Sequence, residues 1–176
     1  NGEDYTLMSG NEVGCLLLDY VVSCRKANGT LPADPVVIKT IVTTEMARKV
    51  AESNGVACFD TFTGFKFMAE KKNLLEASGE GKVIFSYEES YGYMLGDFVR
   101  DKDAVTASML LAEMAAWYAG KDMTLFDAME DLYQRYGWYG EKTHNLVMPG
   151  LDGLADMATL MKNLREKPPA DIAGVK

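Results

Sequence analysis

The stretch Val-Val-Ile-Lys-Thr-Ile-Val at residues 36–42 decides the fold, because six of its seven residues are β-branched and it directly follows Pro35. Such a run is typical of a strand that is covered on both faces. Two further strands are predicted downstream, at 56–62 and 82–86, and a helical pattern separates each strand from the next. Strands joined by crossovers of this length form a parallel or mostly parallel sheet with right-handed connections. The sequence therefore predicts an α/β fold.

Apolar spacing and capping residues place helices around these strands. A first helix is expected from about residue 13 to 24, with Ser9 or Asn11 as its cap and Asn28-Gly29 as its end. Later helices are expected at about 44–54, 63–77, 103–118 and 124–136, and an antiparallel edge strand at 93–99. Together these elements predict a three-layer α/β/α domain with a mixed, mostly parallel sheet of about four strands. In the helix at 103–118 we expect the apolar residues to face the core: Val105, Met109, Leu110, Ala112 and Ala116.

The last forty residues differ in character. After an aromatic and glycine hinge, an extra strand is expected at 143–148 and a helix at 152–166. That helix has an apolar stripe that little remaining sequence can cover. We expect the stripe to pack on the preceding domain, on another copy of the chain by self-association through the helix at 150–166, or on nothing. The predicted domains are 1–137 and 138–176. The stripe comprises Leu154, Met157, Leu160, Met161 and Leu164.

Composition narrows the class of protein. The chain is 48% hydrophobic and 25% charged, which is typical of a globular domain, and no apolar run reaches the roughly 18 residues of a membrane helix. A net charge of -8 argues against nucleic acid as a partner. Three cysteines without metal-type spacing indicate a reducing, cytoplasmic setting. Neither a membrane nor a nucleic acid is expected to bind.

Polar residues follow each predicted strand. In an open α/β sheet, ligands bind beyond the carboxyl ends of the strands, and here 43–44, 61–66 and 87–92 share that edge. Glu88 and Glu89 are neighbours, so on a strand they point to opposite faces and cannot form the facing pair of a glycosidase. Glu88 and Ser90 can face the same side and bind vicinal hydroxyls. A solvated turn is the alternative interpretation.

Other candidate groups lie at two helix starts. Gly64, Phe65 and Lys66 combine helix-start amides, an aromatic face and a cation, which suits a sugar or a phosphate, although Phe65 also fits a core position. Arg100 and Lys102 precede the helix at 103–118 and form either a phosphate-facing pair or a solvated charge run. His144 has no nucleophile pattern near it, and no Cys/His or spaced-aspartate cluster predicts a metal site in this chain.

Four motifs, taken in order and spacing, resemble the third domain of the α-D-phosphohexomutases, and in particular the long bacterial phosphoglucomutase/phosphomannomutase branch. They are Ser-Gly-Asn-Glu-Val-Gly at 9–14, Thr-Gly-Phe-Lys-Phe at 63–67, Tyr-Glu-Glu-Ser-Tyr-Gly at 87–92 and Gly-Asp-Phe-Val-Arg-Asp-Lys-Asp at 96–103. The resemblance covers essentially the whole chain. It implies a four-domain isomerase, an intramolecular phosphotransferase that interconverts hexose 1-phosphate and hexose 6-phosphate through a bisphosphorylated sugar and a phosphoserine.

By motif position, the resemblance implies that Glu88 and Ser90 bind the 3- and 4-hydroxyls of the sugar. Gly64, Phe65 and Lys66 match a loop that shapes the cleft. Lys102, with Arg100 beside it, matches a basic position near the transferring phosphate and is the one candidate catalytic residue. Magnesium and glucose 1,6-bisphosphate, as activator or intermediate, are implied for the full-length enzyme.

The family's phosphoserine loop, magnesium loop and last phosphate-binding loop have no counterpart in this sequence. The partners expected are therefore a hexose phosphate and the missing domains of the same enzyme, and residues 138–176 are expected to begin a truncated phosphate-binding domain. We expect the chain alone to be inactive, because phosphoryl transfer needs an in-line nucleophile, a metal and a second phosphate clamp. The alternative hypothesis is a non-catalytic α/β binding or assembly module.

Overall fold

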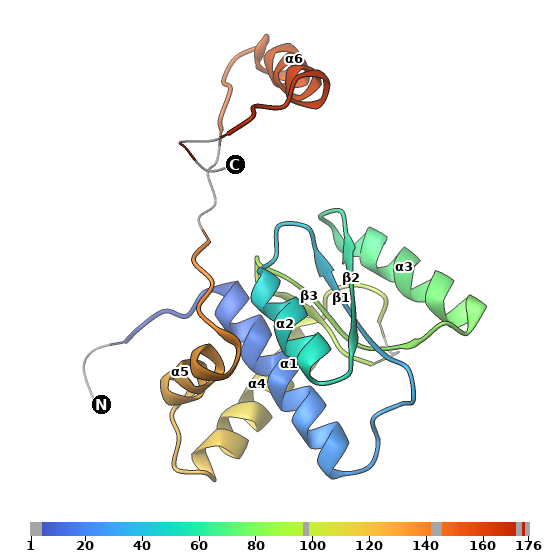
Figure 1. The fold of residues 1–176 in the computed structure, drawn as a ribbon, viewed down its shortest axis with the longest axis vertical. Helices are drawn as coiled ribbons and strands as arrows, with labels where there is room; N and C mark the ends of the chain where they lie inside the picture. The colour runs from blue at the N-terminus through green and yellow to red at the C-terminus, as the bar shows by residue number, and fades with distance from the viewer. Residues whose placement is uncertain (1–4, 97–98, 142–145, 172–173, 175–176) are drawn as a thin grey trace. The chain divides into compact units, whose positions relative to one another are not determined.

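The computed structural model describes residues 5–96, 99–141, 146–171 and 174. The chain divides into two compact units, Asn1–Gly140 and Glu141–Lys176 (Figure 1). The first unit contains the sheet and five helices, α1 to α5. The second contains helix α6 (Gly153–Glu166).

A four-stranded sheet with the order β2-β1-β3-β4 forms the centre of the first unit. Its strands are β1 (Pro35–Thr40), β2 (Ala57–Thr61), β3 (Lys82–Glu88) and β4 (Gly92–Met94). Strand β1 pairs in parallel with β2 and β3, and only β4 runs antiparallel, against β3. The predicted α/β class with a mixed, mostly parallel sheet of about four strands is confirmed.

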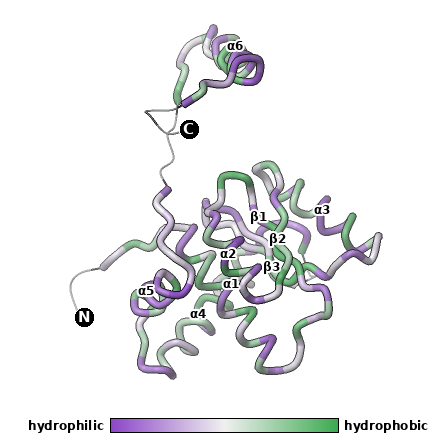
Figure 2. The backbone as a smooth tube through the Cα atoms, viewed as in Figure 1, coloured by the Kyte–Doolittle hydropathy of each residue, from purple (hydrophilic) through white to green (hydrophobic). Residues whose placement is uncertain are grey.

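Helices cover both faces of this sheet (Figure 1). On one face α1 (Gly10–Ala27), α2 (Glu45–Ser53), α4 (Ala104–Ala119) and α5 (Leu125–Tyr136) share a core with alternate residues of the strands. On the other face α3 (Phe65–Ser78) covers a smaller core alone. Figure 2 shows hydrophobic residues recurring along α1 and the adjacent strands, as expected for elements buried between two layers.

Side-chain caps start α1 and α5. Ser9 caps α1 through a capping box with Glu12, and Thr124 does the same for α5 with Asp127. Asn11, the other candidate cap, instead accepts a hydrogen bond from the Thr44 amide through Oδ1 at 3.1 Å. This contact ties the start of α1 to the start of α2.

Three expectations need correction. The edge strand occupies 92–94; of the predicted range 93–99, residues 95, 96 and 99 form no strand, and 97–98 lie outside the described residues. In α4, Val105 and Met109 are 81% and 61% exposed, and the buried face is formed by Leu110, Met114 and Tyr118. The helix is apolar on nearly every side, so its spacing alone did not fix which side faces the core.

The third correction concerns the extra strand predicted at 143–148. Residues 146–148 form no strand, and 143–145, with His144, lie outside the described residues. Within the second unit, the α6 stripe is largely open to solvent, because Leu154 is 84% exposed and Met161 and Leu164 are 40% and 42% exposed. None of the described helices is long and apolar enough to cross a membrane.

Candidate functional site

The carboxyl ends of the three parallel strands meet at one edge of the sheet. Thr40 at the end of β1 pairs in register with Thr61 of β2, and Lys39 pairs with Tyr87 of β3. The segments that follow these strands, which contain most of the predicted site residues, therefore begin side by side. Strand β3 ends at Glu88, one residue beyond the β1 pairing.

Three of the predicted residues converge here from three different segments. The Nζ of Lys102 lies 3.1 Å from Oε1 of Glu88, and it also lies 5.6 Å from the centre of the Phe65 ring. The Glu88 side chain is only 8% exposed, whereas that of Lys102 is 61% exposed. The result is a recessed carboxylate and a buried ring with an accessible ammonium group beside them.

Gly92 makes this convergence possible. It stands opposite Glu88 in the β3–β4 hairpin, and a Cβ at this position would lie 2.6 Å from Glu88 Oε1 and 2.6 Å from the Phe65 ring. Any side chain would displace one of them. The glycine of the Glu-Glu-Ser-Tyr-Gly motif is therefore required by close packing around Glu88.

The backbone segment around Lys102 is anchored by its neighbours along the chain. Arg100 donates to Asn73 Oδ1 of α3 and lies 3.5 Å from Glu76 Oε2. On the other side, Asp103 caps α4, accepting hydrogen bonds from the amides of the first turn, and its amide donates to the Tyr93 carbonyl at 3.2 Å. A hydrogen bond from the Thr106 hydroxyl lowers the pKa of Asp103, so the cap is ionised at neutral pH.

Gly64 and Lys66 flank the site without joining the Glu88 cluster. Gly64 has φ 111, a conformation that favours glycine, and as the N-cap of α3 it makes no side-chain capping bond. In this first turn the Phe67 amide donates to the Gly64 carbonyl at 3.1 Å. The Nζ of Lys66 lies 4.8 Å from the centre of the Phe67 ring, on an exposed side chain.

Ser90 lies in the turn at 89–91 and is exposed. The strand ends at Glu88, so the alternation that was expected to put Glu88 and Ser90 on one face does not extend to Ser90. Their joint access to a ligand depends on the turn instead. Similarly, Arg100 is directed to α3 and is not brought to Glu88 with Lys102.

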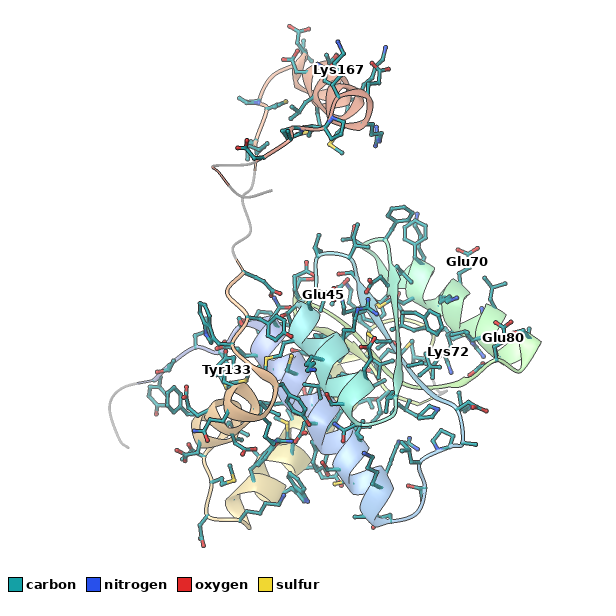
Figure 3. The ribbon with its side chains drawn as sticks, viewed as in Figure 1. Glu45, Glu70, Lys72, Glu80, Tyr133 and Lys167 are labelled. Carbon is teal, nitrogen blue, oxygen red and sulfur yellow. The ribbon has the colours of Figure 1, made fainter. Side chains whose placement is uncertain are left out.

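Two groups at this edge were not predicted. Glu89 accepts hydrogen bonds from the Thr40 and Thr43 hydroxyls through Oε2, at 3.2 and 3.3 Å. Lys39 is fully buried, and its Nζ lies 2.7 Å from Glu45 and 2.9 Å from Asp60. The hydrogen bond from Lys39 lowers the pKa of Glu45, which starts α2 (Figure 3). Only the lysine of this cluster is buried, because the Glu45 and Asp60 side chains are 54% and 34% exposed. A lone lysine in a mainly apolar strand was the sequence signal for it.

Among the described residues, no group of three or more His, Cys, Asp or Glu side chains is arranged to hold a metal ion. The arrangement at Glu88 offers different chemistry. A carboxylate accepts hydrogen bonds from hydroxyl groups, and a lysine ammonium donates to oxygens or phosphate. The Phe65 ring is 4% exposed and belongs to the smaller core, so it supports these two groups from below. The site is thus suited to a polyhydroxylated ligand that carries negative charge nearby.

Comparison with known proteins gives a consistent result. The family described as phosphoglucomutase/phosphomannomutase, alpha/beta/alpha domain III, matches residues 9–136. A phosphoglucomutase of Staphylococcus haemolyticus is 34% identical over 176 residues, which is 100% of this chain and 31% of the relative. A phosphoglucomutase of Staphylococcus aureus is 34% identical over 171 residues, covering 97% of this chain and 30% of the relative. The chain thus spans less than a third of these relatives' length.

A solved structure shares the fold. The open form of pp63/parafusin, a phosphoglucomutase of Paramecium, superposes with a TM-score of 0.59 at 19% sequence identity. The match covers 92% of this chain and 26% of that structure.

Proposed function

Since the chain belongs to the phosphoglucomutase/phosphomannomutase family, whose third α/β/α domain it carries, we propose that it recognises the sugar ring of a hexose phosphate. The proposed full-length enzyme interconverts hexose 1-phosphate and hexose 6-phosphate through a bisphosphorylated intermediate. The observation that supports this role is the convergence of Glu88, Lys102 and Phe65 at the ligand-binding edge of the sheet.

Each proposed role follows from the chemistry of the group. Glu88, recessed and fixed at the end of β3, accepts hydrogen bonds from the 3- and 4-hydroxyls, and the Ser90 hydroxyl both donates and accepts. Lys102 is accessible and donates toward the phosphoryl group or a sugar oxygen, which makes it the candidate catalytic residue. Phe65, buried in the smaller core, supports the cluster from below.

The remaining predicted residues have supporting roles in this proposal. Gly64 and Lys66 shape the entrance of the cleft at the start of α3. Arg100 is proposed to bind substrate, as the resemblance implies, and its half-exposed side chain also contacts Asn73 and Glu76. These contacts are proposed to hold the segment that carries Lys102 against α3.

Phosphoryl transfer also needs an in-line nucleophile, charge compensation and a clamp on the second phosphate. The described residues do not fit a magnesium site, so the metal, the phosphoserine and the second clamp are proposed to come from other domains of a cytoplasmic full-length enzyme. Glucose 1,6-bisphosphate is its proposed intermediate and activator. The chain alone is proposed to be inactive and to bind sugar with a Kd on the order of millimolar or weaker.

Replacing Glu88 by alanine in the full-length enzyme tests the proposal. A hydrogen bond to a charged group contributes about 1.5–3 kcal/mol, so kcat/KM for glucose 1-phosphate is expected to fall about 10- to 100-fold. Glu80→Ala is the matched control, because Glu80 is exposed and lies beyond the far end of α3 (Figure 3). If Glu88→Ala kept the kcat/KM of the parent enzyme, the assignment would be wrong.

A titration of the 176-residue chain separates this function from that of an assembly module. Backbone amides are followed by NMR while glucose 1-phosphate or glucose 1,6-bisphosphate is added. Shifts at residues 87–92 support sugar recognition. Changes that depend on protein concentration and are confined to 150–166 support self-association through α6 instead.

A further inference from the structure

The turn between β3 and β4 is anchored by its middle carboxylate. Glu89 is directed back toward the end of β1, where Oε2 lies 3.2 Å from the Thr40 hydroxyl and 3.3 Å from the Thr43 hydroxyl. The two hydroxyls are 2.7 Å apart, and both threonines are buried, at 0% and 3% exposure. Three oxygens therefore form a compact triangle that joins the turn to β1 and to the loop before α2.

A count of protons shows why this triangle needs Glu89. Two hydroxyls bring two hydrogens, and an ionised carboxylate brings none, so two of the three contacts are donated hydrogen bonds at any moment. Without Glu89, one threonine hydroxyl can donate to the other, but both cannot donate at the same time. The second buried hydroxyl then loses its acceptor, which is unfavourable away from water.

The opposite side of the turn is held by the start of α1. A Cβ at Gly10 would lie 1.9 Å from the Glu89 carbonyl oxygen, so the helix backbone rests directly on the turn. The Tyr91 hydroxyl donates to the Met8 carbonyl at 2.8 Å. Tyr91 has φ 62, as the third residue of a three-residue hairpin turn commonly does, although this conformation is rare for a bulky side chain.

Glu88 and Ser90 immediately precede and follow Glu89. We propose that Glu89 is a positioning residue that does not touch the sugar but fixes the turn, so that Glu88 and Ser90 are presented together to the hydroxyls. This inference rests on the proposed function. It also accounts for the joint action of two residues that strand alternation does not place on one face.

The test uses the full-length enzyme and measures discrimination between glucose 1-phosphate and its 3-deoxy and 4-deoxy analogues, as the ratio of their kcat/KM values. Glu89→Ala is expected to lower this ratio about 10-fold, because a displacement of about 1 Å in a binding group has effects of this size or larger. Glu89→Gln keeps an oxygen acceptor and is expected to stay within about three-fold of the parent. Glu80→Ala is the control and leaves the ratio unchanged.

The conservative variant separates positioning from direct chemistry. Equal losses in Glu89→Gln and Glu89→Ala would show that the charge itself acts, and would overturn the inference. A folded Glu89→Ala enzyme with the parent's ratio would overturn it too. If Glu89→Ala does not fold, Thr43→Val, which removes one of the two donors, replaces it: a lowered ratio supports positioning and an unchanged ratio overturns it.

The same measurements distinguish an error in the proposed function from an error in the positioning role of Glu89. If the parent enzyme does not discriminate against the deoxy sugars, hydroxyl recognition by this loop is wrong, and the inference falls with it. If the parent discriminates and Glu88→Ala abolishes the discrimination while Glu89→Ala preserves it, only the positioning role is wrong.

Discussion

Replacing Gly10 by alanine is expected to destabilise the domain, against the usual trend for this change. Gly10 is the first residue of α1 and does not have a positive φ, so alanine fits its backbone conformation. At such a position glycine to alanine normally stabilises a protein by about 0.4–1 kcal/mol. Here the added Cβ would lie 1.9 Å from the Glu89 carbonyl oxygen, 2.7 Å from its carbon and 3.0 Å from the Tyr91 nitrogen.

The magnitude follows from these distances. Non-bonded heavy atoms settle at roughly 3.5 Å, so helix and turn must separate by about 1.5 Å. The obstructing atoms belong to the backbone of the turn and cannot rotate away as a flexible side chain would. Overpacking of this kind costs about 1–3 kcal/mol, which corresponds to a fall in Tm of about 3–10 °C for a chain of this size.

The assay is thermal unfolding of the 176-residue chain, followed by far-UV circular dichroism. Gly120→Ala is the matched control, because Gly120 has φ -65 and its Cβ would lie 3.5 Å from the Ala116 carbonyl oxygen, an ordinary contact. We expect the control to leave Tm unchanged or slightly raised. A Gly10→Ala chain with a Tm equal to or above that of the parent would refute the close approach of α1 to the turn.

Two further outcomes are expected in solution. The hydrogen bond from the Thr124 hydroxyl lowers the pKa of Asp127 in the folded chain. The capping box of α5 therefore stabilises the fold fully above about pH 4, the pKa of aspartate in the unfolded chain. This stabilisation is lost as the pH falls through the lower pKa of the folded state. The Asp127→Asn variant is therefore expected to have a lower Tm than the parent at pH 7 and the same Tm near pH 2. An equal difference at pH 7 and pH 2 would be inconsistent with an ionised Asp127 in the capping box. Burial raises the pKa of the Cys58 thiol to about 11, so about 0.1% of it is thiolate at pH 8. Iodoacetamide should therefore alkylate this cysteine slowly at pH 8. The rate should rise about tenfold per pH unit up to pH 10, because the thiolate is the reactive form. Peptide mass spectrometry measures the rate, and fast labelling at pH 8 would contradict it.

Features fixed by local hydrogen bonds were the most predictable from sequence. Ser9, one of the two residues expected to cap α1, does so. Like Thr44 and Thr124, which cap α2 and α5, it satisfies amides within three residues of itself. The β-branched run of β1 was equally clear as far as Thr40, since burial on both faces leaves it few alternatives. Its last two residues, Ile41 and Val42, lie instead in an exposed turn beyond the strand. These local signals were sufficient to predict the layers and the edge at which the site lies.

Contacts between distant segments were less predictable. Arg100 and Lys102 are both cations two residues apart, yet one contacts α3 and the other contacts Glu88. That difference depends on Asn73 and Glu76, whose position relative to the loop is set by tertiary packing. For Glu89 the sequence likewise predicted only that its side chain points away from that of Glu88. Its contacts with two threonines were not predicted, because these residues lie more than forty positions earlier in the chain.

The unequal exposure of Glu88 and Lys102 bears on how one site could serve two phosphate positions. The Lys102 side chain is exposed, so it can leave Glu88 when a sugar hydroxyl donates to the buried carboxylate in its place. Glu88 cannot move in the same way, because Gly92 and Phe65 pack closely against it. In the proposed reaction the sugar must present first one end and then the other to the phosphoryl donor. Glu88 is a fixed acceptor for the hydroxyls, and Lys102 beside it is a donor that can change position. Together they allow the same surface to bind the sugar in both orientations.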